Sequence, residues 1–146
     1  MHNTLTRLER WDARLKALFD QIDAELEDYA VQHLSPEAQQ LLKSFPLHPA
    51  RPPAHTTSNP EDDGHFDLGA AFTAGIGSTY GPGYVLTCRI ATLSPVPPDV
   101  QTALEDAVAT RLRQLLPSAF PGTDLALDRD PPPAGPYKLH GDLSLN

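Results

Sequence analysis

The stretch FDLGAAFTAGIGSTYGPGYVLTCRIATL, at 66–93, decides the fold because apolar and polar residues alternate along both of its halves. Alternation with a period of two places the apolar residues on one face of a β-strand. A glycine-rich segment at 75–83 separates the halves. We therefore predict strands over 66–76 and 84–93 that pair as an antiparallel hairpin. The residues expected on its buried face include Phe66, Leu68, Tyr84, Leu86, Cys88 and Ile90.

Helical periodicity flanks this hairpin. Apolar residues recur every three or four positions over 4–32, over 98–116 and, more briefly, over 35–45, which predicts three amphipathic helices. Short apolar stretches over 125–128 and 137–145 predict two more strands. From residue 66 the predicted order is β-β-α-β-β. This order predicts an α+β fold, with a mainly antiparallel sheet packed on one face by the helix at 98–116.

A proline-rich segment, PLHPARPPAHTTSNPEDDGH at 46–65, divides the chain. It holds five prolines and few large apolar residues, so we expect a linker or an ordered loop that lies over the surface as a strap. The chain then divides into a helical arm at 1–45, this strap, and an α+β core at 66–146. With 146 residues in total, we treat the three parts as one structural unit.

Composition limits the classes of function. Eleven Lys and Arg against 19 Asp and Glu give a formal net charge of −8, which argues against binding to nucleic acid or to anionic lipid. The single cysteine, Cys88, excludes an internal disulfide and is expected in the core. No apolar run is long enough to span a membrane, and no signal-peptide pattern opens the chain. We therefore expect a soluble, cytoplasmic protein.

The polar face of the sheet is the candidate ligand site. Alternation places Asp67, His140 and Asp142 in the outward phase of their strands, and histidine beside carboxylates can bind a ligand or move protons. A polar face is also the ordinary state of an antiparallel sheet with one side in water. The predicted ligand-binding residues are His65, Asp67, Arg89, Lys138, His140 and Asp142, with Ser78, Thr79 and Tyr80 at the rim.

We predict no cofactor and no metal. Asp63, His65, His140 and Asp142 are weak candidates for metal ligands, but their spacing matches neither a calcium loop nor a zinc helix. The four glycines of 75–83 follow the pattern GxGxxxGxG with no helix after it, unlike a phosphate-binding loop. A solvated turn and a hairpin loop are the simpler interpretations.

Charge is ordered along the N-terminal helix in the direction that the helix dipole disfavours. Bases, diluted by two acids, occupy its first half, and acids alone occupy its second half. An antiparallel copy would place basic halves beside acidic halves, and two-fold dimers are the commonest assemblies. We therefore predict a homodimer through this helix. The expected interface residues are Leu8, Trp11, Leu15, Leu18, Phe19 and Ile22.

The sequence favours a binding or interaction module that forms a homodimer, with an unknown small-molecule ligand. One alternative is a metal-dependent or acid–base enzyme that uses the carboxylates and histidines around Asp67 and His140. Such an enzyme needs these groups in one cleft, whereas a binding module does not. Another alternative is a structural subunit that docks through its N-terminal helix.

Overall fold

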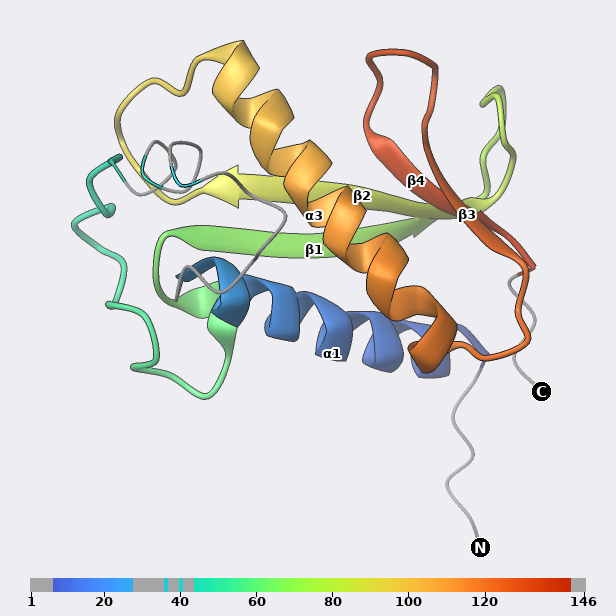
Figure 1. Ribbon diagram of the computed structural model, residues 1–146, viewed down its shortest axis with the longest axis horizontal. Coiled ribbons are helices and arrows are strands. Elements are labelled where there is room, and N and C mark those ends of the chain that lie inside the picture. Colours follow the sequence, from blue (N-terminus) through green and yellow to red (C-terminus); the bar gives the residue numbers. More distant parts are fainter. Residues whose placement is uncertain (1–6, 28–35, 37–39, 41–43, 143–146) are drawn as a thin grey trace, which may run out of the picture.

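The computed structural model describes residues 7–27, 36, 40 and 44–142, and its fold is α+β. Of the predicted helix at 35–45, the described residues Pro36 and Gln40 are helical, and most of the remainder lies outside the described residues. The elements are α1 (Arg7–Glu27), the short 3-10 helix η1 (Pro60–Asp62), β1 (Phe66–Thr73), β2 (Gly83–Ile90), α3 (Pro98–Ala119), β3 (Leu125–Arg129) and β4 (Tyr137–Gly141) (Figure 1).

The four strands form one antiparallel sheet in the order β1-β2-β4-β3. β1 and β2 pair over their whole length, from Phe66 opposite Ile90 to Thr73 opposite Gly83. β4 pairs with β2 opposite Tyr84 and Val85, and its other side pairs with β3. The first strand of the sequence therefore lies at one edge of the sheet, and β3 lies at the other edge.

The predicted hairpin is confirmed, but β1 is shorter than the alternation suggests. It ends at Thr73, and Ile76, which we expected on the buried face, is 98% exposed. Gly75 adopts a positive φ of 75°, and its carbonyl oxygen accepts a 3.0 Å hydrogen bond from the Ser78 amide. A Cβ at Gly75 would lie 2.0 Å from the carbonyl oxygen of Gly81, so only glycine fits this turn.

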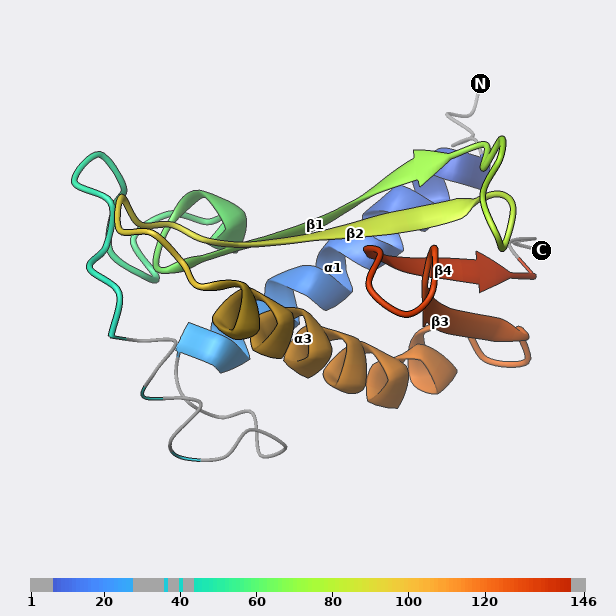
Figure 2. The same cartoon turned by 90° about the horizontal axis from the view of Figure 1, so that it is seen from above.

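Both helices pack against the same face of the sheet (Figures 1 and 2). The apolar stripe of α1 that we assigned to a dimer interface is buried in this core, and the indole of Trp11 stacks on Phe120 with ring centroids 4.2 Å apart. The chain's own sheet and α3 therefore cover this stripe, which removes the reason for placing an interface there. Leu8 lies outside the residues whose side chains are described, and the buried members are Trp11, Leu15, Leu18, Phe19 and Ile22.

The helix α3 runs beyond its predicted end. Pro117 was expected to stop it, but the helix continues to Ala119 with Pro117 in the last turn. The Phe120 amide donates a 2.8 Å hydrogen bond to the Leu116 carbonyl, and burial of the Phe120 ring in the core draws the last turn inward. Pro117 has no amide hydrogen to donate to the Arg113 carbonyl four residues earlier, so the helix continues past it without that hydrogen bond.

The strap at 46–65 lies against the end of the hairpin where β1 begins and β2 ends. The Arg51 guanidinium donates hydrogen bonds of 2.9 Å to the carbonyl oxygens of Asp63, Gly64 and Phe66. The His48 amide donates to the Ala91 carbonyl at 2.9 Å. These contacts join the strap to the start of β1 and to the end of β2.

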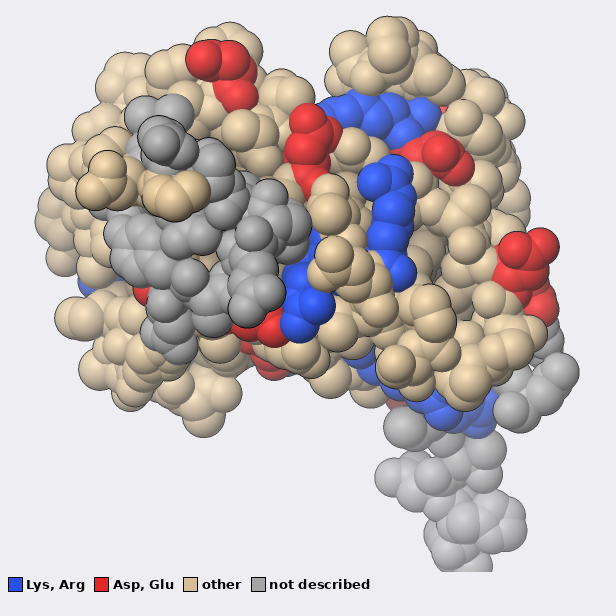
Figure 3. Space-filling model, in the orientation of Figure 1, with Lys and Arg blue, Asp and Glu red and all other residues tan. Residues whose placement is uncertain are grey.

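Acidic and basic side chains alternate on the face that carries α1 and α3 (Figure 3). Arg111 of α3 forms a 2.8 Å ion pair with Glu25 of α1. Arg129 of β3 forms ion pairs with Glu105 at 2.9 Å and with Asp106 at 3.0 Å. We expected the acids of α1 to face a second copy of the helix, but one of them, Glu25, is paired within the chain by Arg111.

Candidate functional site

The register divides the predicted outward-facing residues into two groups. Asp67 pairs with Arg89 near one end of the hairpin, whereas Lys138 pairs with Val85 of the same strand β2. Arg89 and Val85 are four positions apart along β2, and this corresponds to a distance of about 13 Å at about 3.3 Å per residue. His140 lies farther along β4, so Asp67 and His140 do not share one cleft.

Lys138 lies at the centre of the second group and is only 3% exposed, although it points to the face of the sheet that we expected to be solvated. Its ammonium forms a 2.7 Å ion pair with Asp130 and donates to Ser78 Oγ at 2.9 Å and to the Gly81 carbonyl at 2.8 Å. The Thr79 amide donates to the same Asp130 carboxylate at 3.0 Å. Lys138 and Asp130 thus bind the hairpin loop to the loop between β3 and β4, because each contacts residues of both.

The ion pair determines the protonation of the carboxylate. The hydrogen bond from Lys138, together with those from the amides of Thr79 and Tyr80, lowers the pKa of Asp130 to about 2. The Lys138 ammonium is the donor in each of its contacts. It therefore cannot serve as a general base for Ser78, so the contact between these two residues does not make a nucleophile.

His140 and Tyr80 form a stacked pair beside this cluster. Their ring centroids are 4.3 Å apart with an interplanar angle of 15°. The Nε2 atom of His140 lies 2.9 Å from the Asp128 carboxylate on the neighbouring strand β3. The imidazole is therefore held on one side by a carboxylate and on its face by an aromatic ring that the hairpin loop supplies.

A hollow of about 350 Å³ opens next to this cluster. It is lined by the hydroxyl residues Thr73, Ser78 and Thr79, by the glycine-rich loop, by Lys138 and Asp130, and by the apolar residues Ile76, Val85 and Pro131. Figure 1 shows that the hairpin loop and the segment between β3 and β4 rise on the same side of the sheet. The hollow is a polar concavity with a wall that the ion pair holds in place.

The remaining predicted residues lie elsewhere. Asp67 and Arg89 form a cross-strand ion pair of 3.3 Å at the other end of the hairpin. His65 lies beside the buried Glu27, which accepts a hydrogen bond from the His65 amide and lies 3.6 Å from its ring Nδ1. Asp142 follows β4 and is exposed. The ligand set that we expected thus contributes Lys138, His140 and the three rim residues to one place, and the others to separate contacts.

The weak metal candidates divide in the same way. Asp63 and His65 lie at the start of the hairpin, and His140 and Asp142 lie at the far end of β4. Within residues 7–27, 36, 40 and 44–142, no group of three or more His, Cys, Asp and Glu side chains is arranged to hold a metal ion. Cys88, expected in the core, is buried there, and burial raises its thiol pKa to about 12.

Two carboxylates were not among the predicted site residues: Asp130, which lines the hollow, and Asp128, which contacts His140. Asp128 is in the outward phase of its strand, so the alternation of 125–128 contained the signal that would have identified it. Asp130 precedes the run of three prolines, and no periodicity links it to a strand. Its role depends on where the loop between β3 and β4 lies, which a local pattern does not specify.

A second buried polar cluster lies under the start of β1. Asp23 of α1 is 2% exposed, and neither of its carboxylate oxygens has a hydrogen-bond partner among the described residues. Burial raises the pKa of Asp23 to about 8, and the neighbouring Glu27 adds to the effect. In contrast, the pKa of Asp63 is lowered: burial opposes this change, but hydrogen bonds from Thr57 outweigh it. In the sequence, apolar and acidic residues are adjacent over 22–27, and this pattern could have indicated that an acid is buried there.

The fold and the hollow define a small α+β domain in which one sheet face carries two helices and the other carries a polar concavity. The chain belongs to a protein family described as "Uncharacterised protein", whose model matches residues 6–141. It is similar to an uncharacterized protein of Borreliella burgdorferi, with 31% identity over 98 residues that cover 67% of this chain and 74% of that one. No solved structure matches the chain.

Among the described residues, no helix combines the length and the apolar composition that a membrane span needs.

Proposed function

We propose that this protein is a binding module whose ligand is a small polar molecule held in the hollow beside the hairpin loop. The observation that supports this proposal is the buried Lys138–Asp130 ion pair, which fixes a glycine-rich loop over a concavity of about 350 Å³. Binding sites of this kind place a few polar groups in a preformed concavity. Hydroxyl groups of Thr73 and Thr79 and the loop backbone would supply hydrogen bonds to the ligand.

An enzyme that combines Asp67 with His140 is not supported, because the register separates them. The contacts of Lys138 also argue against a nucleophilic serine at Ser78. We place the binding module in the cytoplasm, a proposal supported by the single buried cysteine, which fits a reducing compartment.

The test is a protein-observed NMR titration with separate mixtures of monosaccharides, nucleosides and amino acids. We expect shifts in the amides of Gly77, Ser78 and Thr79 for one of these mixtures. Asp130→Ala should abolish them, because the loop loses its attachment. Arg89→Ala, a change at the other end of the hairpin, is the matched control and should leave them unchanged. Shifts that persist in Asp130→Ala, or that occur only at distant residues, would contradict the proposal.

A two-fold homodimer is a second proposal, supported by the charge order of α1. Its apolar stripe is buried within the chain, so the polar side of α1 would have to form the contact. Native mass spectrometry of the purified protein reports the oligomeric state and any retained ligand together. A homogeneous monomer at micromolar concentration would reject the dimer.

A further inference from the structure

The exposed edge of β1 has backbone groups that are free to pair with another strand. The Ala91 amide donates to the His65 carbonyl, so residues 65 and 91 form a hydrogen-bonded pair of the ladder. Hydrogen-bonded and non-bonded pairs alternate in an antiparallel sheet. The backbone groups of Phe66, Leu68, Ala70 and Phe72 therefore point away from β2.

The first two of these residues are covered. The Phe66 carbonyl accepts the hydrogen bond from Arg51, which shows directly that this group points to the edge. Leu68 is only 2% exposed, so its outward groups are not accessible to another chain. Ala70 and Phe72 are more exposed, and their outward amides and carbonyls have no backbone partner among the described residues, which is the arrangement that a neighbouring strand requires.

A groove runs along this edge between β1 and α1. Its volume is about 310 Å³, and it is bordered by Gly69, Ala70 and Ala71, whose small side chains leave room for another backbone. Leu15 and Phe19 of α1 form part of its apolar lining. Phe72, also part of the lining, is 43% exposed and would be covered by an added strand.

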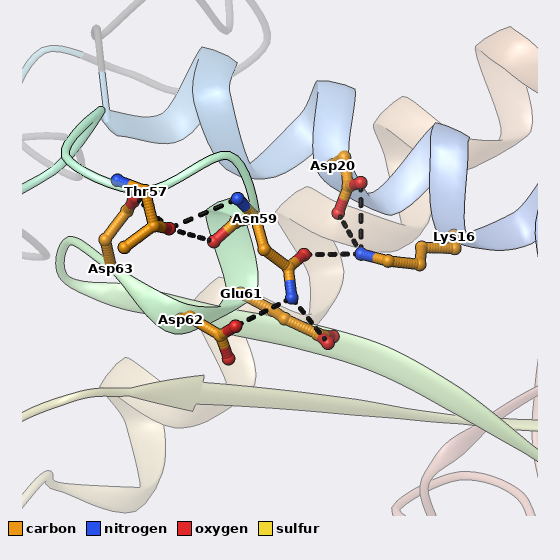
Figure 4. Close-up of polar contacts among 7 residues, drawn as sticks. All are labelled: Lys16, Asp20, Thr57, Asn59, Glu61, Asp62 and Asp63. Atoms are coloured by element: carbon orange, nitrogen blue, oxygen red, sulfur yellow. Dashed lines mark hydrogen bonds and ion pairs between the residues drawn. The ribbon is translucent and has the colours of Figure 1, made fainter.

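The rim of the groove is acidic. Asp12, Asp20 and Glu61 lie on it together with one base, Lys16, so its formal charge is 1 − 3 = −2. Lys16 is already bound, because its ammonium lies 3.1 Å from Asp20 and 2.5 Å from the Asn59 side-chain oxygen (Figure 4). The Asn59 side-chain amide in turn donates to Glu61 at 3.2 Å. The free charge that faces an incoming strand is therefore negative.

We propose that the β1 edge binds an extended, basic segment of a partner protein, which pairs with Ala70 and Phe72 as an added strand. Main-chain hydrogen bonds supply affinity in this mode of recognition, and alternate side chains supply specificity. Apolar side chains of the segment lie on the groove lining, and Lys or Arg side chains reach Asp12, Asp20 and Glu61. A second copy of β1 is disfavoured, because the two-fold arrangement brings two acidic rims together.

The test uses fluorescence anisotropy with a labelled peptide of alternating valine and lysine. We expect saturable binding that weakens with salt, because the rim charges act across solvent. A peptide with glutamate in place of lysine should bind at least tenfold more weakly. The double variant Asp12→Asn/Glu61→Gln should bind the basic peptide several-fold more weakly and with a smaller salt dependence.

Backbone pairing is tested separately. Ala70→Pro removes an amide that points away from β2 and should weaken binding at least tenfold, while circular dichroism shows an unchanged fold. Two peptides, one N-methylated at its odd-numbered residues and the other at its even-numbered residues, test the same point on the unaltered protein. The peptide that loses the amide hydrogens facing β1 should not bind.

Three outcomes would overturn the proposal. One is no binding of the basic peptide, and another is equal binding by Ala70→Pro together with tolerance of both methylation phases. The third is sedimentation of the protein as a dimer that Ala70→Pro converts to monomer without any peptide binding, because the occupant would then be a second copy.

Discussion

The two edges of the sheet differ in how their outward backbone groups are covered. At β3 the same alternation points Leu125, Leu127 and Arg129 outward, because the Asp130 amide donates to the Pro136 carbonyl. Arg113 of α3 occupies the middle of this edge by donating to the Leu127 carbonyl at 2.6 Å. At β1 the arginine lies at the first residue of the strand, and the outward groups of Ala70 and Phe72 have no backbone partner among the described residues.

This difference follows from which element supplies the arginine. Arg113 projects from α3, and its guanidinium also lies 5.6 Å from the ring of Tyr137, so packing of the helix fixes its position. Arg51 projects from the strap, and its guanidinium reaches β1 only at Phe66, the first residue of the strand. Edge strands are usually protected against pairing with other chains. An edge of eight residues that is protected at one end only is therefore a place where pairing is permitted.

The largest expected effect concerns the buried acids: Asp23, beside β1, has no hydrogen-bond partner among the described residues, whereas Asp130, after β3, is paired with Lys138. The raised pKa of Asp23, about 8 in the fold and about 3.8 when unfolded, means that ionisation opposes folding. No penalty exists below the unfolded pKa. It grows as pH rises from about 4 to about 8 and is constant above that, reaching on the order of 5 kcal/mol.

Asp23→Asn should therefore gain stability over the wild type as pH rises from 4 to 8, measured by urea unfolding at each pH. Asp20→Asn, at a more exposed position of the same helix, is the control and should show little change with pH. If the difference between Asp23→Asn and wild type is flat across this range, Asp23 is not a buried, unpaired acid.

The second comparison removes the arginine from each edge. Arg51→Ala loses three hydrogen bonds and should lower the free energy of unfolding by about 2–4 kcal/mol. Arg113→Ala loses one hydrogen bond and one contact with an aromatic ring and should cost about 1–2 kcal/mol. Chemical denaturation measures both. A larger loss of stability in Arg113→Ala than in Arg51→Ala would contradict the inference that Arg51 contributes more to the stability of the fold.

The order of elements could be predicted from the sequence because periodicity is local. Phe66 to Ile90 alternates as a hairpin must, and Val100 to Leu116 keeps a helical stripe. Strand order was not accessible, because placement of β4 beside β2 depends on distant packing. The stripe on α1 was recognised as apolar, but the sequence does not state whether its own sheet or a second copy covers it.

The candidate site was predicted in part for the same reason. The outward phase of His140 and Lys138 follows from alternation along β4. The burial of Lys138 depends on how the hairpin loop folds over the sheet, and its partner Asp130 lies in a proline-rich loop without a period. His65 and Asp67 lie at the other end of the hairpin. The sequence could not predict this separation because it does not specify the register of the strands.

A third comparison separates alternate residues within β1. Ala71 belongs to a hydrogen-bonded pair with Val85, whereas Ala70 points its amide to the edge. Ala71→Pro should lower stability by about 1–3 kcal/mol more than Ala70→Pro, because it leaves a buried carbonyl without its donor. Thermal unfolding of both variants checks this. Equal losses would indicate that the outward groups are not those assigned here.

Amide hydrogen exchange followed by NMR tests the open β1 edge most directly. In the free protein, the amides of Ala70 and Phe72 should exchange faster than those of Gly69 and Ala71. Adding the valine–lysine peptide should slow these two outward amides and leave that of Leu127 on β3 unchanged. Slow exchange of the outward amides in the free protein, or peptide protection at β3 instead of β1, would contradict the account.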